Sequence, residues 1–457
     1  MKKTISSVAK MLPGGNSHSY DNVNSSLLKN QVVIHLLIVL CCLLSYFPVF
    51  YNKFQNKWDD QWVVINDYTS RGFNVDNIWS ILTEYYHGQY APANQLYYTF
   101  LHSLDGYNPL VFHSASLLLH LINSCLVYLL LTKLLTLIFK DDKEKDDINI
   151  LAFLSSIIFV IHPVNAEAVA WVAASKILVY SFFYLWALNI YVGHVRQPQN
   201  INYLYIFVLF TLSFAGKEQA VTFPVCMVLI DYFAGRNILD KRFWIEKIPF
   251  FIFSLFFGWL TIESQAAIGS GLMSGSKEYP FPQRIVFASY CIIEYATKCV
   301  LPLKLSYIYP FPNDIGEQLP FRFYYYPVAL VALIGFGWKA FKKPIILFGV
   351  LFFIIHICLL LHIMPISRFA ITADRYVYIS SIMGCLFISF LYISLKSKFN
   401  QHIGIINISM FFILVSLISY TNVRVRVWED SITLKKEIRN ILESRPDFME
   451  LKGRNTK

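Results

Sequence analysis

Long apolar runs recur along the chain, and short polar links separate them. Most of the runs approach the ~20 residues that a helix needs to cross the hydrocarbon core of a membrane. A helix also satisfies its own backbone polar groups where no water can do so. The pattern therefore predicts an all-α polytopic membrane protein with about eleven transmembrane helices. They are expected near residues 31–51, 108–139, 150–161, 177–193, 201–215, 220–234, 248–262, 323–338, 344–364, 376–395 and 403–420.

The composition is typical of a membrane protein and indicates which partners to expect. Of the 457 residues, 56% are hydrophobic and only 15% are charged, against about 25% charged in a soluble domain. The net charge of +10 is spread over short links, so we expect a lipid bilayer around the protein and no nucleic-acid partner. The eight cysteines lie almost entirely in apolar segments without a CxxC pair, and we expect no metal and no cofactor.

The basic links decide the predicted orientation. Lys and Arg gather at residues 235–247, 339–344 and 396–398, which the positive-inside rule places in the cytoplasm. Residues 284–303 are apolar enough to resemble a span, but Glu294 and Lys298 would each cost about 2.5–3.5 kcal/mol at a helix centre. An amphipathic helix on the outer surface at this place keeps all three links inside. Eleven spans with an outer C-terminus follow.

The expected organisation has three parts. Residues 1–30 form a cytoplasmic leader, and the first apolar run after it is longer than a signal-peptide core and lacks a small-residue cleavage site. Residues 31–420 form the transmembrane domain, and residues 421–457 form a short outer helical tail. Two outer loops lie within the domain, at 52–107 and 263–322, and amphipathic helices are expected in the outer loops.

Ionisable residues collect at the outer mouths of the predicted helices. Such residues at membrane depth must be paired or solvated, so their convergence on one face suggests a single site. Acids beside cations suit the transfer of a sugar from a lipid-linked phosphate to a hydroxyl. One carboxylate, Asp59 or Asp60, would take the proton of the acceptor, and cations such as Lys217 and Arg375 would stabilise the leaving phosphate. Acids at helix mouths are also common without any catalytic role.

Seven motifs occur in one order between residues 58 and 435, and together they resemble a known family. They are "WDD" (58–60), "QYAP" (89–92), "GYNPLVFHSASLLLHLINSCLVY" (106–128), "HPVNAEAVAWV" (162–172), "GKEQAVTFPVCMVLIDY" (216–232), "ADRYVY" (373–378) and "RVRVWEDSITL" (424–434). The ordered set resembles the transmembrane and tetratricopeptide-repeat O-mannosyltransferases and their bacterial relatives. The resemblance implies a C-type (GT-C) glycosyltransferase fold, a polyprenyl-phosphate sugar as donor, and the acid pair as catalytic motif. It favours Asp59 over Asp60 as the base.

The other candidate site residues each have a functional and a structural interpretation. We expect Arg375 to bind the donor phosphate with Asp374 orienting it, or Asp374 only to hold Arg375 in place. The remaining substrate-binding candidates are Tyr90, His162, Glu167, Lys176, Lys217 and Glu218. Alternatively, His162 caps a turn, Glu167 pairs with Lys176, and Lys217 and Glu218 form a solvated pair.

The predicted activity is transfer of the lipid-linked sugar to a Ser or Thr hydroxyl of an exported protein. Transfer to an envelope glycan or lipid, transport of the lipid-linked sugar, and a non-catalytic scaffold are the alternatives. Asn165, Ala91 and Lys176-Ile177 depart from patterns common in the family, so mannose is not assumed as the sugar. No repeat array follows residue 448, which favours a bacterial inner membrane with a periplasm-facing site.

Overall fold

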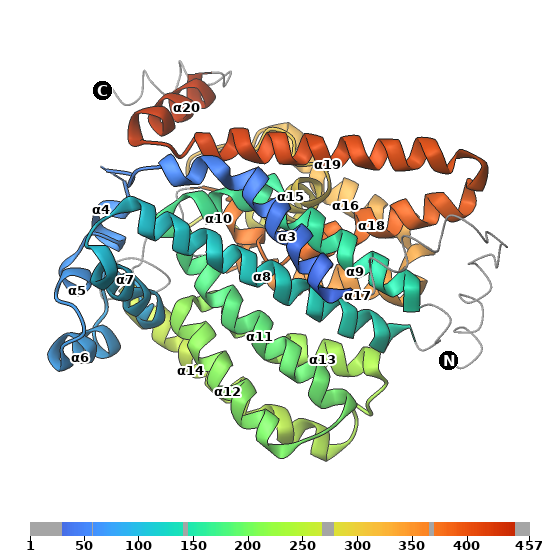
Figure 1. Cartoon of the computed structure of the whole chain (residues 1–457), viewed down its shortest axis with the longest axis horizontal. Helices are drawn as coiled ribbons and strands as arrows, with labels where there is room; N and C mark the ends of the chain where they lie inside the picture. Colours follow the sequence, from blue (N-terminus) through green and yellow to red (C-terminus); the bar gives the residue numbers. More distant parts are fainter. Residues whose placement is uncertain (1–29, 57, 140–144, 267–277, 365–369, 444–457) are drawn as a thin grey trace.

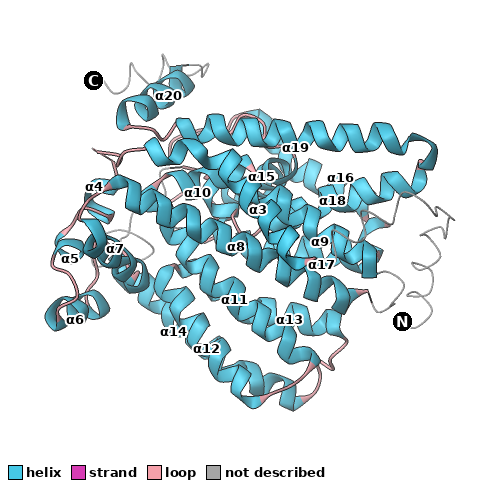
Figure 2. Ribbon diagram, in the orientation of Figure 1, coloured by secondary structure: helices cyan, strands magenta, loops and turns pink. Residues whose placement is uncertain are grey.

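The computed structural model describes residues 30–56, 58–139, 145–266, 278–364 and 370–443. These residues form helices joined by turns and loops, and no strand occurs among them (Figure 2). The longer helices are α3 (Gln31–Tyr46), α8 (Pro109–Ile138), α9 (Lys145–Val160), α11 (Lys176–Arg196), α12 (Asn200–Gly216), α13 (Phe223–Ala234), α14 (Lys241–Ala266), α15 (Phe281–Val300), α16 (Tyr325–Gly337), α17 (Pro344–Ile357), α18 (Ser381–Lys398) and α19 (Ile403–Arg426).

Shorter helices gather at one end of this bundle, on the left of Figure 1. They are α4 (Asp60–Val63), α5 (Asp67–Ser70), α6 (Val75–Thr83) and α7 (Pro92–Asp105). The helix α20 (Ser431–Glu443) projects from the bundle above them. The first predicted outer loop, residues 52–107, is therefore a small helical unit.

Several helices have the dimensions of membrane spans. Among the described residues, six helices are long and apolar enough to cross a membrane, and a seventh results if the bent pair Asp147–Val160 and Pro163–Ala170 counts as one. Three shorter apolar helices, Asn200–Gly216, Phe321–Gly337 and Pro344–Leu360, accompany them. The prediction of an all-α polytopic membrane protein is confirmed. The count of eleven spans stays a prediction.

Local sequence sets the helix boundaries. The Asn108 side chain accepts a hydrogen bond from the Leu110 N–H at the start of α8, and Pro109 occupies the first helical position, where its missing N–H is not needed. α13 ends at Gly235, whose φ of 80° favours glycine. α19 continues to Arg426, past the predicted end at residue 420, because Thr421 is buried and donates to the Ile161 carbonyl.

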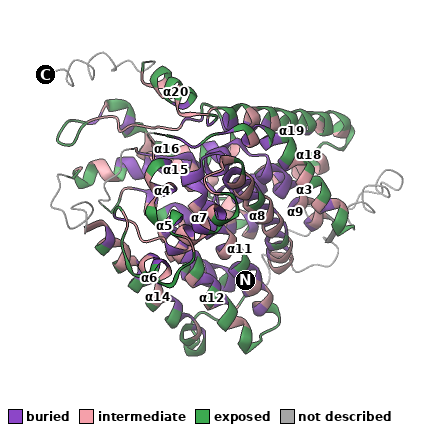
Figure 3. Cartoon of the chain, turned by 60° about the vertical axis from the view of Figure 1, so that its left-hand side comes forward, coloured by how far each residue is buried: buried purple, intermediate pink, exposed green. Residues whose placement is uncertain are grey.

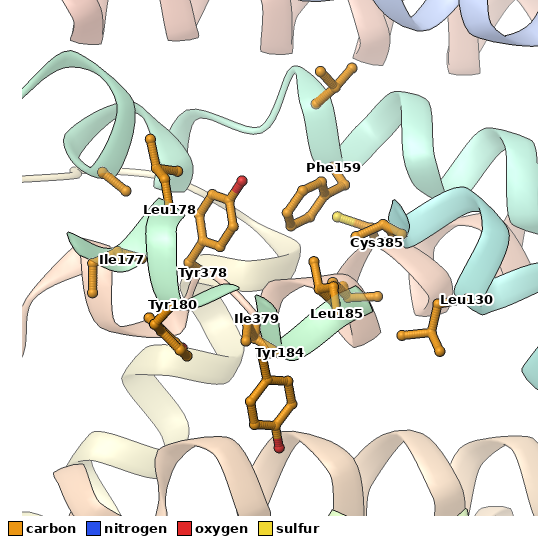
Figure 4. Packing of buried hydrophobic residues seen from close by; sticks show 14 of the residues in the cluster. Leu130, Phe159, Ile177, Leu178, Tyr180, Tyr184, Leu185, Tyr378, Ile379 and Cys385 are labelled. Carbon is orange, nitrogen blue, oxygen red and sulfur yellow. The ribbon is translucent and has the colours of Figure 1, made fainter. Parts of the chain in front are cut away.

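The core lies where α8, α9, α11 and α18 meet, and Figure 4 shows part of it. Phe159 and Tyr378 pack there edge to face, with ring centroids 5.2 Å apart. Helices at the periphery of the bundle are less buried. α16 has no buried residue, and α19 is exposed along most of its length (Figure 3). Apolar helix surfaces of this kind in a membrane protein face lipid.

α15 covers most of the segment expected on the outer surface, and it is not among the helices apolar enough to cross a membrane. It packs closely on α18, where a Cβ on Gly384 would come within 2.5 Å of the Cys299 carbonyl oxygen. Small residues permit such close helix contacts. Lys298 of α15 is buried and pairs with Asp374 at 3.3 Å, so its charge is compensated inside the protein.

We predict that α15 lies on the outer side without crossing the membrane. Single cysteines at Asp314 and at Lys342 should then react with an impermeant maleimide from the outer and the inner side, respectively. The labelling needs a background with Cys358→Ser, because Cys358 is exposed. Reaction of both positions from the same side would contradict the eleven-span topology.

Candidate active site

The two carboxylates of the acid pair lie in different environments. Asp60 is fully buried at the start of α4. Its Oδ2 accepts from the Gln55 N–H at 2.7 Å, and its Oδ1 accepts from the Ala173 N–H at 2.9 Å. Both oxygens are thus used to tie the first outer loop to the short helix η5 (Val172–Ser175). Asp60 has the contacts of a positioning residue.

Asp59 is half-buried, and its carboxylate makes no hydrogen bond or ion pair within the described residues. Its backbone is already helical, with φ −61° and ψ −24°, and its carbonyl accepts from the N–H groups of Trp62 and Val63. The backbone is therefore fixed while the carboxylate is available. A general base needs such an available carboxylate within reach of the acceptor hydroxyl.

Burial raises the pKa of the Asp60 carboxyl from its ordinary value of 3.8 to about 6, although the N–H groups of Gln55 and Ala173 favour its ionised form. The native protein therefore holds a proton on Asp60 between about pH 4 and pH 6, where the unfolded chain has lost it. The stability that this group contributes falls as the pH rises through that window and is constant above it.

We predict that this pH dependence disappears in Asp60→Asn. The stability advantage of the wild type over the variant should shrink by about 3 kcal/mol from pH 4 to pH 7, because Asn does not titrate. Thermal unfolding of both proteins in detergent across this range measures it. Asp76→Asn, at an exposed acid of α6, is the control. A stability difference that does not change with pH would contradict the prediction.

An aromatic cluster of Trp58, Trp171, Tyr307 and Trp428 adjoins the acid pair. The Trp58 Nε1–H donates to the Tyr307 hydroxyl at 2.5 Å. The rings of Trp171 and Trp428 stack with centroids 5.1 Å apart, and Tyr307 meets both edge to face. Four distant segments of the chain thus meet beside Asp59. Sequence reasoning missed Tyr307 entirely, and it noted Trp428 only within the last motif.

Arg375 lies against this cluster, and Glu167 orients it. One guanidinium nitrogen of Arg375 donates to Glu167 Oε1 at 2.5 Å, and the Arg375 backbone N–H donates to Oε2 at 2.9 Å. The guanidinium carbon lies 5.2 Å from the Trp171 ring centroid. Glu167 is buried, whereas a fifth of the Arg375 side chain is exposed. The arginine therefore has a fixed direction and an accessible edge.

The expected contact between Asp374 and Arg375 is wrong. Asp374 Oδ1 pairs with Lys298 of α15 at 3.3 Å and accepts from the Tyr309 hydroxyl at 2.8 Å. The side chains of adjacent residues leave the short helix η10 (Asp374–Val377) in different directions, so Asp374 holds α15 while Arg375 faces the cluster.

Two lysines extend the positive charge around Arg375. Lys217 pairs with Glu218 at 3.1 Å, and its Nζ lies 5.7 Å from the Tyr376 ring centroid. Lys176 donates to the neutral Gln89 Oε1 at 3.0 Å and makes no ion pair within the described residues. The suggested pairing of Glu167 with Lys176 is therefore wrong.

We call Lys176, Lys217 and Arg375 the cation group. Lys176 lies close enough to Lys217, Arg375 and the Glu218 carboxylate to interact with all three electrostatically. Two carboxylates, Glu167 and Glu218, pair with members of the group. These three cations and two carboxylates together carry one net positive charge, and an anion would be stabilised beside them.

Two predicted site residues lie apart from this group. His162 is buried, and its Nδ1 accepts from the Val164 N–H, so it caps the break between α9 and the following helix α10 (Ala166–Ala170). Tyr90 donates to the Leu82 carbonyl at 2.8 Å within the first outer loop. The described part of the chain contains no cluster of three His, Cys, Asp or Glu side chains that could hold a metal ion.

The chain is similar in sequence to several known proteins. No protein-family model matches the chain. The human protein O-mannosyl-transferase TMTC1 is 27% identical over 203 residues, which are 40% of this chain and 22% of the relative. The Drosophila melanogaster protein O-mannosyl-transferase Tmtc3 is 28% identical over 169 residues, which cover 33% of this chain and 18% of the relative. A Caenorhabditis elegans protein O-mannosyl-transferase is 32% identical over 160 residues, which cover 35% of this chain and 21% of the relative.

The chain is a distant relative of the protein O-mannosyl-transferases. The matched stretch spans about a fifth of the length of these curated relatives. The resemblance inferred from the ordered motifs is thereby confirmed at the level of family likeness. The function of this chain therefore has to be inferred from the residues of its own site.

Proposed function

We propose that the protein is a membrane glycosyltransferase that moves a sugar from a polyprenyl phosphate to a Ser or Thr hydroxyl of an exported protein. The observation that carries the proposal is the available carboxylate of Asp59 at the same end of the bundle as a cation group with one excess positive charge. The names of the relatives support a protein acceptor.

The reaction is a single displacement. The acceptor hydroxyl oxygen attacks the anomeric carbon of the sugar, and Asp59 takes the hydroxyl proton as the new carbon–oxygen bond forms. The bond between the anomeric carbon and the phosphate oxygen breaks, and its electron pair leaves with the polyprenyl phosphate. The products are the O-glycosylated protein and the free lipid phosphate, and Asp59 returns its proton to water.

The cation group acts on the leaving phosphate. That phosphate gains negative charge in the transition state, so cations fixed in advance stabilise it more than they stabilise the bound donor. Arg375 offers two N–H groups in a planar fork, and Glu167 keeps the fork in place. Lys176 brings a third positive charge, and its ammonium donates to the neutral Gln89 Oε1.

A phosphate leaving group explains why one free carboxylate is enough. A glycosidase uses two carboxyl groups across the scissile bond, one of them as an acid for a poor leaving group. Here the second acid, Asp60, has both oxygens engaged by backbone N–H groups. The acid pair thus fits a transferase with a base and a positioning residue.

The orientation expected from the basic links puts the site on the non-cytoplasmic side of the membrane, which we propose is the periplasmic face of a bacterial inner membrane. Mass spectrometry of exported proteins and envelope glycans, with and without the gene for this chain, tests the proposed acceptor. Loss of a single sugar from Ser or Thr residues of exported proteins is the expected result. Unchanged proteins together with a glycan that lacks one sugar would contradict the protein acceptor.

A further inference from the structure

A cavity of about 50 Å³ lies within the first outer loop. Residues of α4, α5, α6, α7 and the link 84–91 line it, among them Trp62, Tyr68, Ser80, Glu84 and Asn94. One buried water needs about 10–15 Å³, so the cavity has room for a small side chain. All of the lining residues come from the unit at the left of Figure 1, outside the candidate membrane spans.

The cavity lies on the Asp59 side of α4. Residues three and four positions apart share one face of a helix. Asp59 is helical, and Trp62, three positions later, shares its face of α4 and lines the cavity. Asp60 points about 100° away around the helix axis and is buried against η5. An acceptor held in the cavity would therefore approach the available carboxylate.

The chemistry of the lining suits a peptide. Asn94 is 3% exposed and lines the cavity, and its Oδ1 has no hydrogen-bond partner among the described residues. Glu84 is exposed at the rim and accepts from the Tyr68 hydroxyl at 2.5 Å. Amide groups pair with peptide N–H and C=O groups, aromatic rings pack on apolar side chains, and a carboxylate attracts a basic side chain.

The same lining disfavours the lipid-linked donor. Its charged member is the carboxylate Glu84, which repels a phosphate. Lys176 touches the cavity only indirectly, through Gln89 at its wall. The residues that line the cavity lie outside the candidate membrane spans, whereas a lipid-linked donor must remain at the membrane surface.

We propose that this cavity binds the acceptor peptide, an inference that rests on the proposed function and adds the site and preference of its acceptor. One small side chain that flanks the reacting Ser or Thr enters between α4, α6 and α7, and Glu84 at the rim selects peptides with a neighbouring Lys or Arg. Asn94 bonds the peptide backbone.

Ser80→Trp, which fills the cavity from α6, tests the inference, with Ser103→Trp at an exposed position of α7 as matched control. The probe is a fluorescent pentapeptide with one Thr next to one Lys. In the full-length protein, Ser80→Trp should weaken peptide binding and raise the peptide KM by roughly tenfold or more, with kcat and the donor KM unchanged. Glu84→Gln should reduce the preference for this peptide over its Lys→Glu analogue.

Other outcomes would overturn the inference. Unchanged peptide affinity in both variants would exclude the cavity as the acceptor site, and a raised donor KM in Ser80→Trp would make it a donor site. Peptide binding is measured without turnover, so it separates the two proposals. Peptide binding by the wild type that is lost in Ser80→Trp, with no sugar transferred by either protein, would refute the proposed function and leave only the peptide-binding site.

Discussion

Replacing Asp59 by Asn is expected to slow sugar transfer by roughly 10²- to 10⁴-fold while donor binding and thermal stability are retained. Asn preserves the shape of the side chain and removes its ability to take a proton. The Asp59 carboxylate supports no hydrogen bond or ion pair within the described residues, so its loss should not disturb the fold. Single-turnover transfer to a peptide, with donor binding measured separately, gives both quantities.

Two matched variants separate catalysis from structure. Asp76→Asn removes an exposed acid in the same loop and should leave transfer unchanged. Asp60→Asn leaves a backbone N–H without its acceptor and should lower stability by about 1–3 kcal/mol. Near-normal transfer in Asp59→Asn, with strong loss in a stable Asp60→Asn variant, would assign the base to Asp60 instead.

Truncating Arg375 to Ala should impair donor binding and turnover together, by roughly 10- to 100-fold in kcat/KM, since a hydrogen bond to a charged group contributes about 1.5–3 kcal/mol. Arg375→Lys should recover only part of the activity, because it keeps the charge and loses the fork. Kinetics with varied donor concentration measure the effect. Arg375→Ala with full donor affinity and turnover would rule out the phosphate role.

The ion pair with Glu167 supplies the control for folding. Arg375→Ala alone leaves a buried carboxylate without its partner, which costs about 3–5 kcal/mol. Glu167→Gln combined with Arg375→Ala removes that charge, so the double variant should regain thermal stability and stay inactive. If the double variant regains activity as well, Arg375 serves only to neutralise Glu167.

The sequence predicted the helices well, because long apolar runs in a membrane have one solution for their backbone hydrogen bonds. It also identified the helix mouths where charged residues collect. It could not assign partners among those charges. Asp374 and Arg375 are adjacent, yet one meets Lys298 of α15 and the other meets Glu167. Such choices depend on side-chain directions that are fixed only when the helices pack.

The acid pair shows the same limit. "WDD" marks two equivalent carboxylates, and a single turn of helix points them in directions about 100° apart. Only the positions of Gln55 and Ala173 show which acid is engaged. Trp428 and Tyr307 reach the site from segments far along the chain, and no local spacing connects them with residue 59.

The proposed transfer reaction is tested most directly with the purified protein in lipid vesicles. The vesicles contain polyprenyl-phosphate sugars, and the Thr-containing peptide is added to them. We expect one sugar to be added to the Thr hydroxyl for each polyprenyl phosphate released, with both signals reduced together in Asp59→Asn. Release of polyprenyl phosphate without modified peptide, or equal transfer by wild type and Asp59→Asn, would contradict it.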